Sequence, residues 1–357
     1  MVRAIPFSKN FSLILKISRL QRLLKINEQT GIETRSVVDL WSDPRWRRTI
    51  PPKAEEVDTM WRQYGVQLAK KAALKALLDS ETQASDITHL VAVTATNAGS
   101  PGYDQIVARE LGIPAHAERL LISGVGCAGG LAALRVASNL ARAATSQGRP
   151  ARILVLACEI CSIFICSELH AMSTSQDMGI AVALFGDGAA ALVVCNSEGM
   201  TRVHNEKNLP GRFSIVDSRS VITPGTHNEM EDKVTSTGFR LVLSKNVPKL
   251  TSASLARPFE SLIVENGMSD ASPTDFDWAV HPGGLSIIKG AQAAMGLPDE
   301  LVAASNEVYR TRGNTSSVAV LAALDKLRTM EMKKQHVVAS SFGPGLTTEM
   351  MLLKRWQ

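Results

Sequence analysis

The 357-residue sequence has few aromatic residues, no long apolar run and no regular set of cysteines. Aromatic side chains make up 5% of the residues and the basic residues are scattered, which argues against a stacking surface for nucleic acid. No apolar stretch reaches the length that a membrane-spanning helix needs, so no membrane span is expected. Five cysteines, an odd number in a long chain, do not indicate a disulfide framework. They favour a reducing compartment, and we expect a cytoplasmic protein.

Acidic residues are absent from the first 27 residues, where six basic residues lie among Phe, Leu and Ile. This composition fits a mitochondrial presequence or an amphipathic helix packed on the domain. The helix is favoured, because nothing like a cleavage site precedes the next helical pattern. The chain also lacks the glycine patterns that bind nucleotide phosphates in P-loops and dinucleotide folds.

The residues that are present favour a large folded unit. Hydrophobic residues make up 45% of the chain and charged residues 20%, which allows a substantial buried core. The length fits two average domains or one large α/β unit. The formal net charge of +5 suits an anionic small ligand, such as a thioester that carries a nucleotide.

Helical periodicity and short apolar runs alternate along both halves of the sequence, which predicts a layered α/β protein. We expect helices at 11–27, 55–78, 103–111, 127–145, 285–295 and 314–332, with partly helical segments at 238–249 and 254–266. We expect strands at 89–94, 119–122, 152–158, 189–195, 278–280, 337–341 and 348–353. The last two strands are predicted to form a hairpin.

Cys127 lies in a turn of small residues, Ser123-Gly124-Val125-Gly126-Cys127-Ala128-Gly129-Gly130, just before a strong helical pattern. A helix N-terminus favours negative charge, so we expect the pKa of this thiol to be lowered and its thiolate to act as a nucleophile. The alternative is that Cys127 is a small buried hydrophobic residue, as most cysteines in α/β proteins are.

His281 and Asn314 are the candidate partners of this thiol. His281 ends an apolar strand and precedes Pro282-Gly283-Gly284, where the glycines permit close approach of a ligand or another backbone. Taken alone, His281 is more typical of a turn or core histidine than of a catalytic one, and Asn314 is typical of a helix N-cap. Functional residues of α/β sheets gather where strands end and helices begin, so we expect the three residues to meet.

Three further cysteines have the spacing of metal ligands, but the residues between them do not fit a metal site. Cys158, Cys161 and Cys166 have C-x2-C-x4-C spacing, and Cys195 could be a fourth ligand. The interval holds bulky apolar residues where a zinc knuckle has glycine, so no metal is expected.

Six motifs, in this order along the chain, resemble those of the type III polyketide synthases, the chalcone-synthase-like group of the thiolase superfamily. They are Gly126-Cys127-Ala128-Gly129-Gly130, Cys158-Glu159-Ile160, Ala183-Leu184-Phe185-Gly186-Asp187-Gly188-Ala189-Ala190, His281-Pro282-Gly283-Gly284, Gly313-Asn314-Thr315-Ser316-Ser317 and Phe342-Gly343-Pro344-Gly345-Leu346-Thr347. The resemblance runs from about residue 18 to the C-terminus. The stretch that begins at Cys158 is most similar to fungal members, many of which take long acyl starters.

The resemblance implies a five-layer αβαβα thiolase fold made of two similar halves, and a homodimer. Residues 1–200 would carry the nucleophilic cysteine, and residues 201–357 the histidine and asparagine. Cys127 would hold the acyl chain as a thioester and His281 would act as its base. His281 and Asn314 together would stabilise the malonyl carbonyl.

The same resemblance assigns binding roles to further residues. Phe185 would be the gate between the CoA tunnel and the cavity. Arg22 and Lys25 would contact the phosphates of CoA, with Gln29 at a third position that is basic in the family. The loop that shapes the cyclisation cavity would consist of Gly343, Pro344 and Gly345.

Three features depart from the family pattern. The first core strand of the family is missing or is replaced by residues 1–10. The segment between Glu159 and Phe185 is longer than in plant members, so a plant-type substrate is not expected. Ser100 replaces a large residue of plant enzymes and would leave room for a long alkyl tail, which an apolar pocket favours by about 0.8 kcal/mol per buried CH2.

The implied activity is iterative decarboxylative condensation of malonyl-CoA onto a medium- or long-chain acyl-CoA starter held on Cys127. Cyclisation would then give alkylpyrone or alkylresorcinol/resorcylic products, with no cofactor other than the CoA thioester substrates. One alternative is a β-ketoacyl carrier-protein synthase III, which shares the Cys-His-Asn set and condenses once. The other is an inactive dimer partner that binds acyl-CoA.

Overall fold

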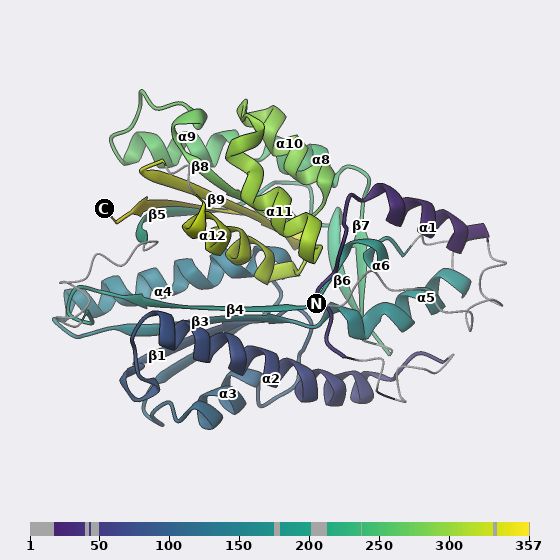
Figure 1. Ribbon diagram of the computed structural model, residues 1–357, viewed down its shortest axis with the longest axis horizontal. Helices are drawn as coiled ribbons and strands as arrows, with labels where there is room; N and C mark the ends of the chain where they lie inside the picture. The colour runs from purple at the N-terminus through teal and green to yellow at the C-terminus, as the bar shows by residue number, and fades with distance from the viewer. Residues whose placement is uncertain are drawn as a thin grey trace.

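Apolar runs of the sequence form the strands of two buried sheets, and the helical segments pack around them (Figure 1). The computed structural model describes residues 18–39, 43, 50–174, 179–200, 213–236, 238–330 and 334–356. The first sheet has the strand order β2-β1-β3-β4. Its strands are β1 (His89–Val93), β2 (Glu118–Ile122), β3 (Arg152–Glu159) and β4 (Gly188–Cys195). β1 is parallel to β2 and to β3, and β4 runs antiparallel to β3 at the sheet edge.

The second sheet has the order β5-β10-β9-β8. Its strands are β5 (Phe213–Ile222), β8 (Asp277–Val280), β9 (His336–Gly343) and β10 (Thr347–Arg355). β8 is parallel to β9, whereas β10 is antiparallel to both of its neighbours. The β9–β10 pair confirms the hairpin that was predicted around residues 343–345.

Five layers result from this arrangement (Figure 1). The middle layer, between the sheets, contains α4 (Gly129–Ser146) and α12 (Ala319–Thr329), whose apolar faces share one core with both sheets. The outer face of the first sheet is covered by α2 (Ala54–Asp79) and α3 (Tyr103–Leu111). Outside the second sheet lie α8 (Val247–Ala253), α9 (Ala256–Glu265) and α10 (Leu285–Met295), whereas α11 (Ala303–Arg312) packs against β8 and α12 and contributes to both cores. The predicted αβαβα order is therefore present.

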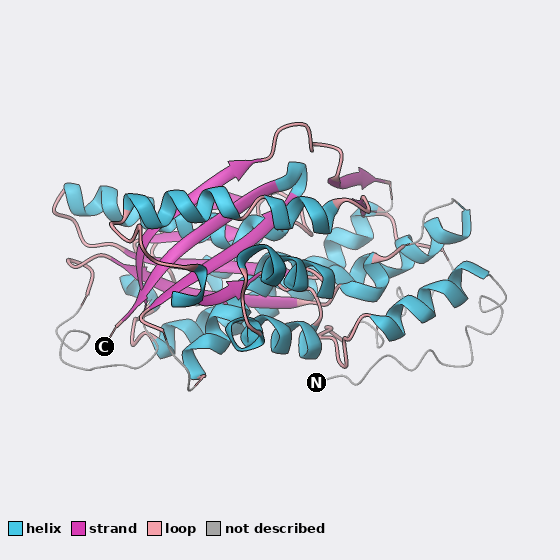
Figure 2. Ribbon diagram, turned by 90° about the horizontal axis from the view of Figure 1, so that it is seen from above, coloured by secondary structure: helices cyan, strands magenta, loops and turns pink. Residues whose placement is uncertain are grey.

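A smaller group of elements lies at one end of the sheets. It contains the antiparallel hairpin of β6 (Met230–Thr235) and β7 (Gly238–Leu243), together with α1 (Ser18–Gln29), α5 (Ile165–Thr174) and α6 (Ala181–Leu184). Leu23 of α1 packs with Met172 and Ala183, which joins these helices. Figure 2 shows from above that the helices at this end project beyond the strands of the two large sheets.

Several predicted elements need correction. Residues 238–243 form strand β7 and not part of a helix, because they pair with β6. Strands β5 and β6 and helix α11 were not predicted. The helix expected from Asn314 begins at Ala319, after a 3-10 turn at Ser316–Val318, so Asn314 is not its N-cap. Residues 1–17, which include the start of the helix predicted at 11–27 and the possible replacement of the first strand, lie outside the described residues. Among the described helices, none is long and apolar enough to cross a bilayer.

Candidate active site

Cys127 is held in a 3-10 turn, Gly126–Ala128, directly ahead of α4. Gly126 has φ 49°, in the left-handed region that favours glycine. A Cβ at Gly126 would lie 2.5 Å from Cδ of Pro344, so the cysteine turn and the turn after β9 pack directly against each other. The requirement for glycine before Cys127 therefore comes from both the backbone and the neighbouring loop.

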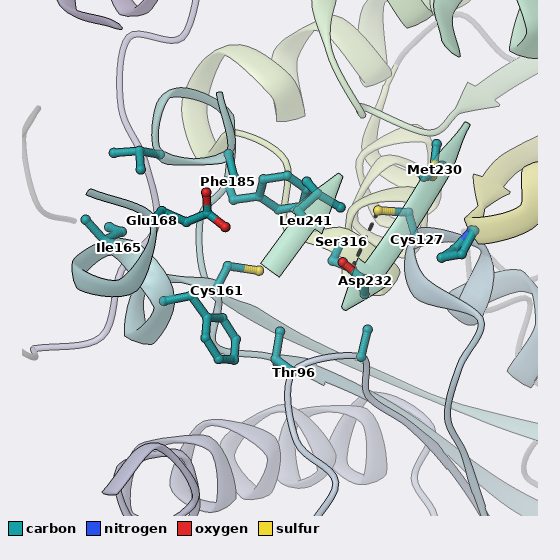
Figure 3. A pocket seen from close by; sticks show the side chains of 15 residues that line it. Thr96, Cys127, Cys161, Ile165, Glu168, Phe185, Met230, Asp232, Leu241 and Ser316 are labelled. Atoms are coloured by element: carbon teal, nitrogen blue, oxygen red, sulfur yellow. Dashed lines mark hydrogen bonds between the residues drawn. The ribbon is translucent and has the colours of Figure 1, made fainter. Parts of the chain in front are cut away.

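Ser316 and Asn314 contact the thiol. The Cys127 Sγ lies 3.6 Å from the Ser316 Oγ (Figure 3). The Asn314 side chain also forms a hydrogen bond with the thiol. Ser316 has φ 52°, which is uncommon for a residue with a side chain. Its backbone N–H donates to Asn314 Oδ1 at 2.8 Å. Asn314 thus fixes the strained turn that presents Ser316 to Cys127.

Asn314 also connects the thiol with the histidine turn. Its Nδ2 donates to the Gly283 carbonyl at 3.2 Å, two residues after His281. His281 is 3% exposed, and no hydrogen-bond partner reaches its Nδ1 from the described part of the chain. These contacts bring the C-terminal end of β8 and the Asn314 turn next to the Cys127 turn. The catalytic roles of His281 and Asn314 stay predictions.

The pKa of Cys127 is not lowered, in contrast to the expectation from its place before a helix. Burial raises the pKa of the Cys127 thiol to about 12, and the nearby Asp232 and Glu159 carboxylates raise it further, whereas the hydrogen bonds with Ser316 and Asn314 lower it. Burial also lowers the pKa of the His281 imidazole to about 3. Desolvation disfavours the charged form of each group, so burial favours the thiol over the thiolate and the neutral imidazole over the imidazolium.

A buried carboxylate, Glu159 at the end of β3, supports the floor of the site. It accepts hydrogen bonds from the Thr96 hydroxyl at 2.8 Å, the Ala95 N–H at 3.0 Å and the Ser317 hydroxyl. Burial raises the pKa of this carboxyl to about 7. In the sequence analysis Glu159 appeared only as part of a matched motif. The signal that could have singled it out is an acidic residue at the end of an otherwise apolar strand.

A cavity of about 700 Å³, open solvent at its mouth included, lies in front of Cys127. Phe185 and Pro344 line the cavity, as the resemblance implies. Gly343 and Gly345 flank Pro344 in its turn. His281 and Asn314 are buried and are not among the lining residues.

Ser100 does not line the cavity of its own chain, in contrast to the prediction. Ala95 and Thr96 occupy the wall, because Glu159 binds the Ala95 N–H. The chain then turns away at Asn97, whose side-chain oxygen accepts from the Gly99 N–H at 3.0 Å, and Ser100 is exposed. Within one chain, the small residue that contributes space is Ala95.

Arg22 and Lys25 lie on the exposed side of α1, on one face with Gln29. The opposite side of α1 packs through Leu23 against α5 and α6, which contribute Ile165 and Val182 to the cavity wall. The two basic residues are therefore near the cavity end of the molecule, but they are not among the residues that line it.

Sequence reasoning missed two cavity carboxylates, Glu168 of α5 and Asp232 of β6, and did not place Cys161 there (Figure 3). Asp232 could not be found, because its strand was not predicted. In the described residues, no group of three or more His, Cys, Asp or Glu side chains is placed to hold a metal ion. Cys158 instead donates to the Gly65 carbonyl at 3.3 Å.

Comparison with known proteins identifies the family. The model for the N-terminal domain of chalcone and stilbene synthases matches residues 17–198, and the model for the C-terminal domain matches residues 214–356. The chain belongs to this family. It is 39% identical to the type III polyketide synthase pspB of Penicillium soppii, over 94% of this chain and 87% of that protein. It is 36% identical to the acylalkylpyrone synthase csyB of Aspergillus oryzae, over 94% of this chain and 86% of the relative.

Solved structures agree with the sequence relatives. A type III pentaketide synthase from Neurospora crassa superimposes with a TM-score of 0.90 at 36% identity, covering 95% of this chain and 92% of that one. A structure of CsyB with CoA-SH has a TM-score of 0.90 at 35% identity, with the same coverage. The thiolase fold is therefore confirmed, and this chalcone-synthase-like protein is a type III polyketide synthase, an acyltransferase.

Proposed function

We propose that this synthase condenses malonyl-CoA repeatedly onto a medium- or long-chain fatty acyl-CoA starter and closes the product to an alkylpyrone or an alkylresorcinol/resorcylic ring. The observation that carries the proposal is one cavity that joins the Cys127 thiol to a mostly apolar wall. Ile165, Val182, Phe185 and Leu241 form part of that wall. Each CH2 of an acyl tail buried there would contribute about 0.8 kcal/mol.

Starter loading would begin with proton transfer from the Cys127 thiol to His281, since burial favours the uncharged form of both groups. The thiolate attacks the acyl-CoA carbonyl, the new C–S bond forms, and CoA leaves with the proton from His281. Burial makes the charged pair short-lived, so the free enzyme would not carry a persistent thiolate.

Malonyl-CoA then loses CO2 and becomes an enolate. Two preorganised N–H donors aimed at its oxygen would each stabilise the transition state by roughly 3–4 kcal/mol. The Asn314 amide and the His281 imidazole are the proposed donors. Phe185 lines the cavity, and its backbone forms a β-bridge with that of Asn314, which keeps Asn314 close to the cavity wall. The enolate carbon attacks the thioester on Cys127 and lengthens the chain by two carbons.

The positions of α1 and β2 support proposals for CoA binding and for a homodimer. The exposed basic face of α1 with Arg22 and Lys25 would bind the CoA phosphates, since it lies at the cavity end. The edge strand β2, where Leu120 is 45% exposed, supports a homodimer. Free cysteines throughout the described residues support a reducing, cytoplasmic setting. No cofactor besides the CoA thioesters is required by the chemistry above.

The test is a panel of acyl-CoA starters, from C2 to C20, incubated with malonyl-CoA and the purified protein, with products identified by mass spectrometry. We expect tri- and tetraketide pyrones or resorcinols from medium and long starters, and none from the Cys127→Ala variant. One added C2 unit on a carrier protein would support a carrier-protein synthase instead. Acyl-CoA binding without release of CoA or CO2 would support the inactive partner.

A further inference from the structure

The hairpin of β6 and β7 presents a carboxylate to the cavity. Asp232 of β6 pairs directly across from Leu241 of β7, and both line the cavity together with Met230. Strand alternation sends the neighbouring side chains to the other face. There Lys233 Nζ lies 3.4 Å from Glu231 Oε2. Asp232 is therefore placed in the cavity by the register of the hairpin.

The Asp232 carboxylate lies beside the nucleophile. Its Oδ2 is 3.7 Å from the position that a Cβ on Gly126 would take, one residue before Cys127, and its charge raises the pKa of the Cys127 thiol. Figure 3 shows Asp232 and Cys127 among the side chains that line the cavity. The part of the chain that the structure describes offers it no hydrogen bond and no ion pair.

The other ionisable groups that face this space are Cys127, Cys161 and Glu168, and no lysine, arginine or histidine is among the described lining residues. Asp232 is exposed to the cavity, yet desolvation by the surrounding cavity wall raises the pKa of its carboxyl group to about 6. A carboxyl group that titrates close to neutral pH can both accept and return a proton. A substrate chain in the cavity can therefore supply a partner for Asp232.

We propose that Asp232 is the acid–base residue of ring closure and product release. This inference rests on the proposed function, because it needs a β-polyketide chain on Cys127. Such a chain carries enol hydroxyl groups within reach of its thioester.

In the pyrone-forming step, an enol oxygen attacks the thioester carbonyl. The new O–C bond forms, the C–Sγ bond breaks, and the enol proton passes to the Asp232 carboxylate. Asp232 then returns this proton to the Cys127 sulfur, so the products are the lactone and the free thiol. The step consumes no other reactant.

Two other groups fit this role less well. Glu168 accepts a hydrogen bond from the Leu241 backbone N–H, so its carboxylate already has a protein partner. His281 is buried and is not among the lining residues. Asp232 combines exposure to the cavity with proximity to the thiol.

The experiment measures cyclised and linear products per CoA released, by mass spectrometry, for the wild type and for Asp232→Asn, Asp232→Ala and Asp232→Glu. Glu231→Gln is the matched control, because it removes the adjacent carboxylate that faces away from the cavity. General acid–base groups contribute about 10²-fold or more, and pyrones also close unaided, so we expect the cyclised-to-linear ratio to fall about 10-fold in Asp232→Asn. Asp232→Glu should recover most of the ratio, and Glu231→Gln should match the wild type.

A wild-type ratio in Asp232→Asn and Asp232→Ala would overturn the inference. Intact-protein mass spectra of Cys127 identify a second contrary result: if the variants fold but no longer accept the starter, Asp232 acts before ring closure and the inference is wrong. Extended chains that accumulate on Cys127 would support it. A wild type that makes no polyketide from any starter would contradict the proposed function itself.

Discussion

Two opposing sets of interactions act on the pKa of the Cys127 thiol. Its place before α4 and its hydrogen bonds with Ser316 and Asn314 favour the thiolate, whereas burial and two carboxylates favour the thiol. The balance lies with the thiol, so small changes in hydrogen bonding should change its reactivity measurably.

Replacing Ser316 by alanine tests this balance. Loss of the contact to Sγ should raise the pKa of Cys127 and slow its alkylation by iodoacetamide by roughly 3–10-fold, as expected for a net hydrogen bond of about 0.5–1.5 kcal/mol. The measurement is the alkylation rate as a function of pH. Ser305→Ala is the control, since Ser305 is a buried serine of α11 whose hydroxyl has no partner in the described residues. Faster alkylation of the Ser316 variant would contradict this account.

Glu159 predicts a dependence of stability on pH. Its pKa is raised from 4.5 to about 7 in the folded state, so between these values the folded protein keeps a proton that the unfolded chain has lost. Stability therefore falls as pH rises through this window, by at most about 1.4 kcal/mol per pH unit. Glu159→Gln cannot titrate, and its melting temperature should fall less than that of the wild type between pH 5 and 7.5. If the melting temperatures of the two proteins fall equally between pH 5 and 7.5, the raised pKa of Glu159 is contradicted.

At the scale of elements, the sequence predicted those strands and helices whose residues are mainly apolar and buried. β3 and α10 are examples, since both have continuous or periodic apolar patterns. β6 contains Glu231, Asp232 and Lys233 in succession and forms half of a partly exposed hairpin, so no apolar pattern marks it. The sequence motifs predicted the nucleophile and its partners. They did not predict the Asp232 carboxylate, because it reaches the cavity from a hairpin that the sequence pattern does not mark.

The turns that position Cys127 make a second element-scale prediction. Gly126 and Gly124 both have positive φ, at 49° and 76°, but only a Cβ at Gly126 would clash, with Pro344. Alanine at either position should cost about 1–2 kcal/mol of backbone strain. Gly126→Ala should lose a further 1–3 kcal/mol or so from overpacking and most of its activity. Urea unfolding and CoA release measure the two effects, and equal results for both variants would show that the contact with Pro344 is unimportant.

At the scale of the whole molecule, the site exists only where the two sheets and their middle helices meet. Cys127 precedes α4, whereas His281 and Asn314 follow elements of the second part of the chain. A Cβ at Gly129 would lie 2.6 Å from a methyl group of Val93 and 3.2 Å from the Ser317 Cβ, so close packing of α4 holds these parts together. Loss of this packing should therefore abolish activity before the individual sheets unfold.

One ion pair crosses the same junction and supplies the last prediction. Arg135 of α4 binds Glu349 of β10 with two hydrogen bonds of 2.9 and 2.7 Å, and Glu349 is 3% exposed. Arg135→Met leaves the buried carboxylate with the Ser220 hydroxyl at 2.8 Å and should cost about 3–5 kcal/mol of unfolding free energy.

The double variant Arg135→Met with Glu349→Met should regain most of that loss, because it removes the uncompensated charge and keeps similar volume. Arg328→Met is the control: its pair with Asp79 is more exposed and should contribute about 1 kcal/mol or less. Urea unfolding of the wild type, Arg135→Met, Glu349→Met and the double variant closes a double-mutant cycle, and Arg328→Met is measured beside them. If Arg135→Met is no more destabilising than Arg328→Met, the buried pair does not hold the junction, and the shared core of α4 and α12 must do so alone.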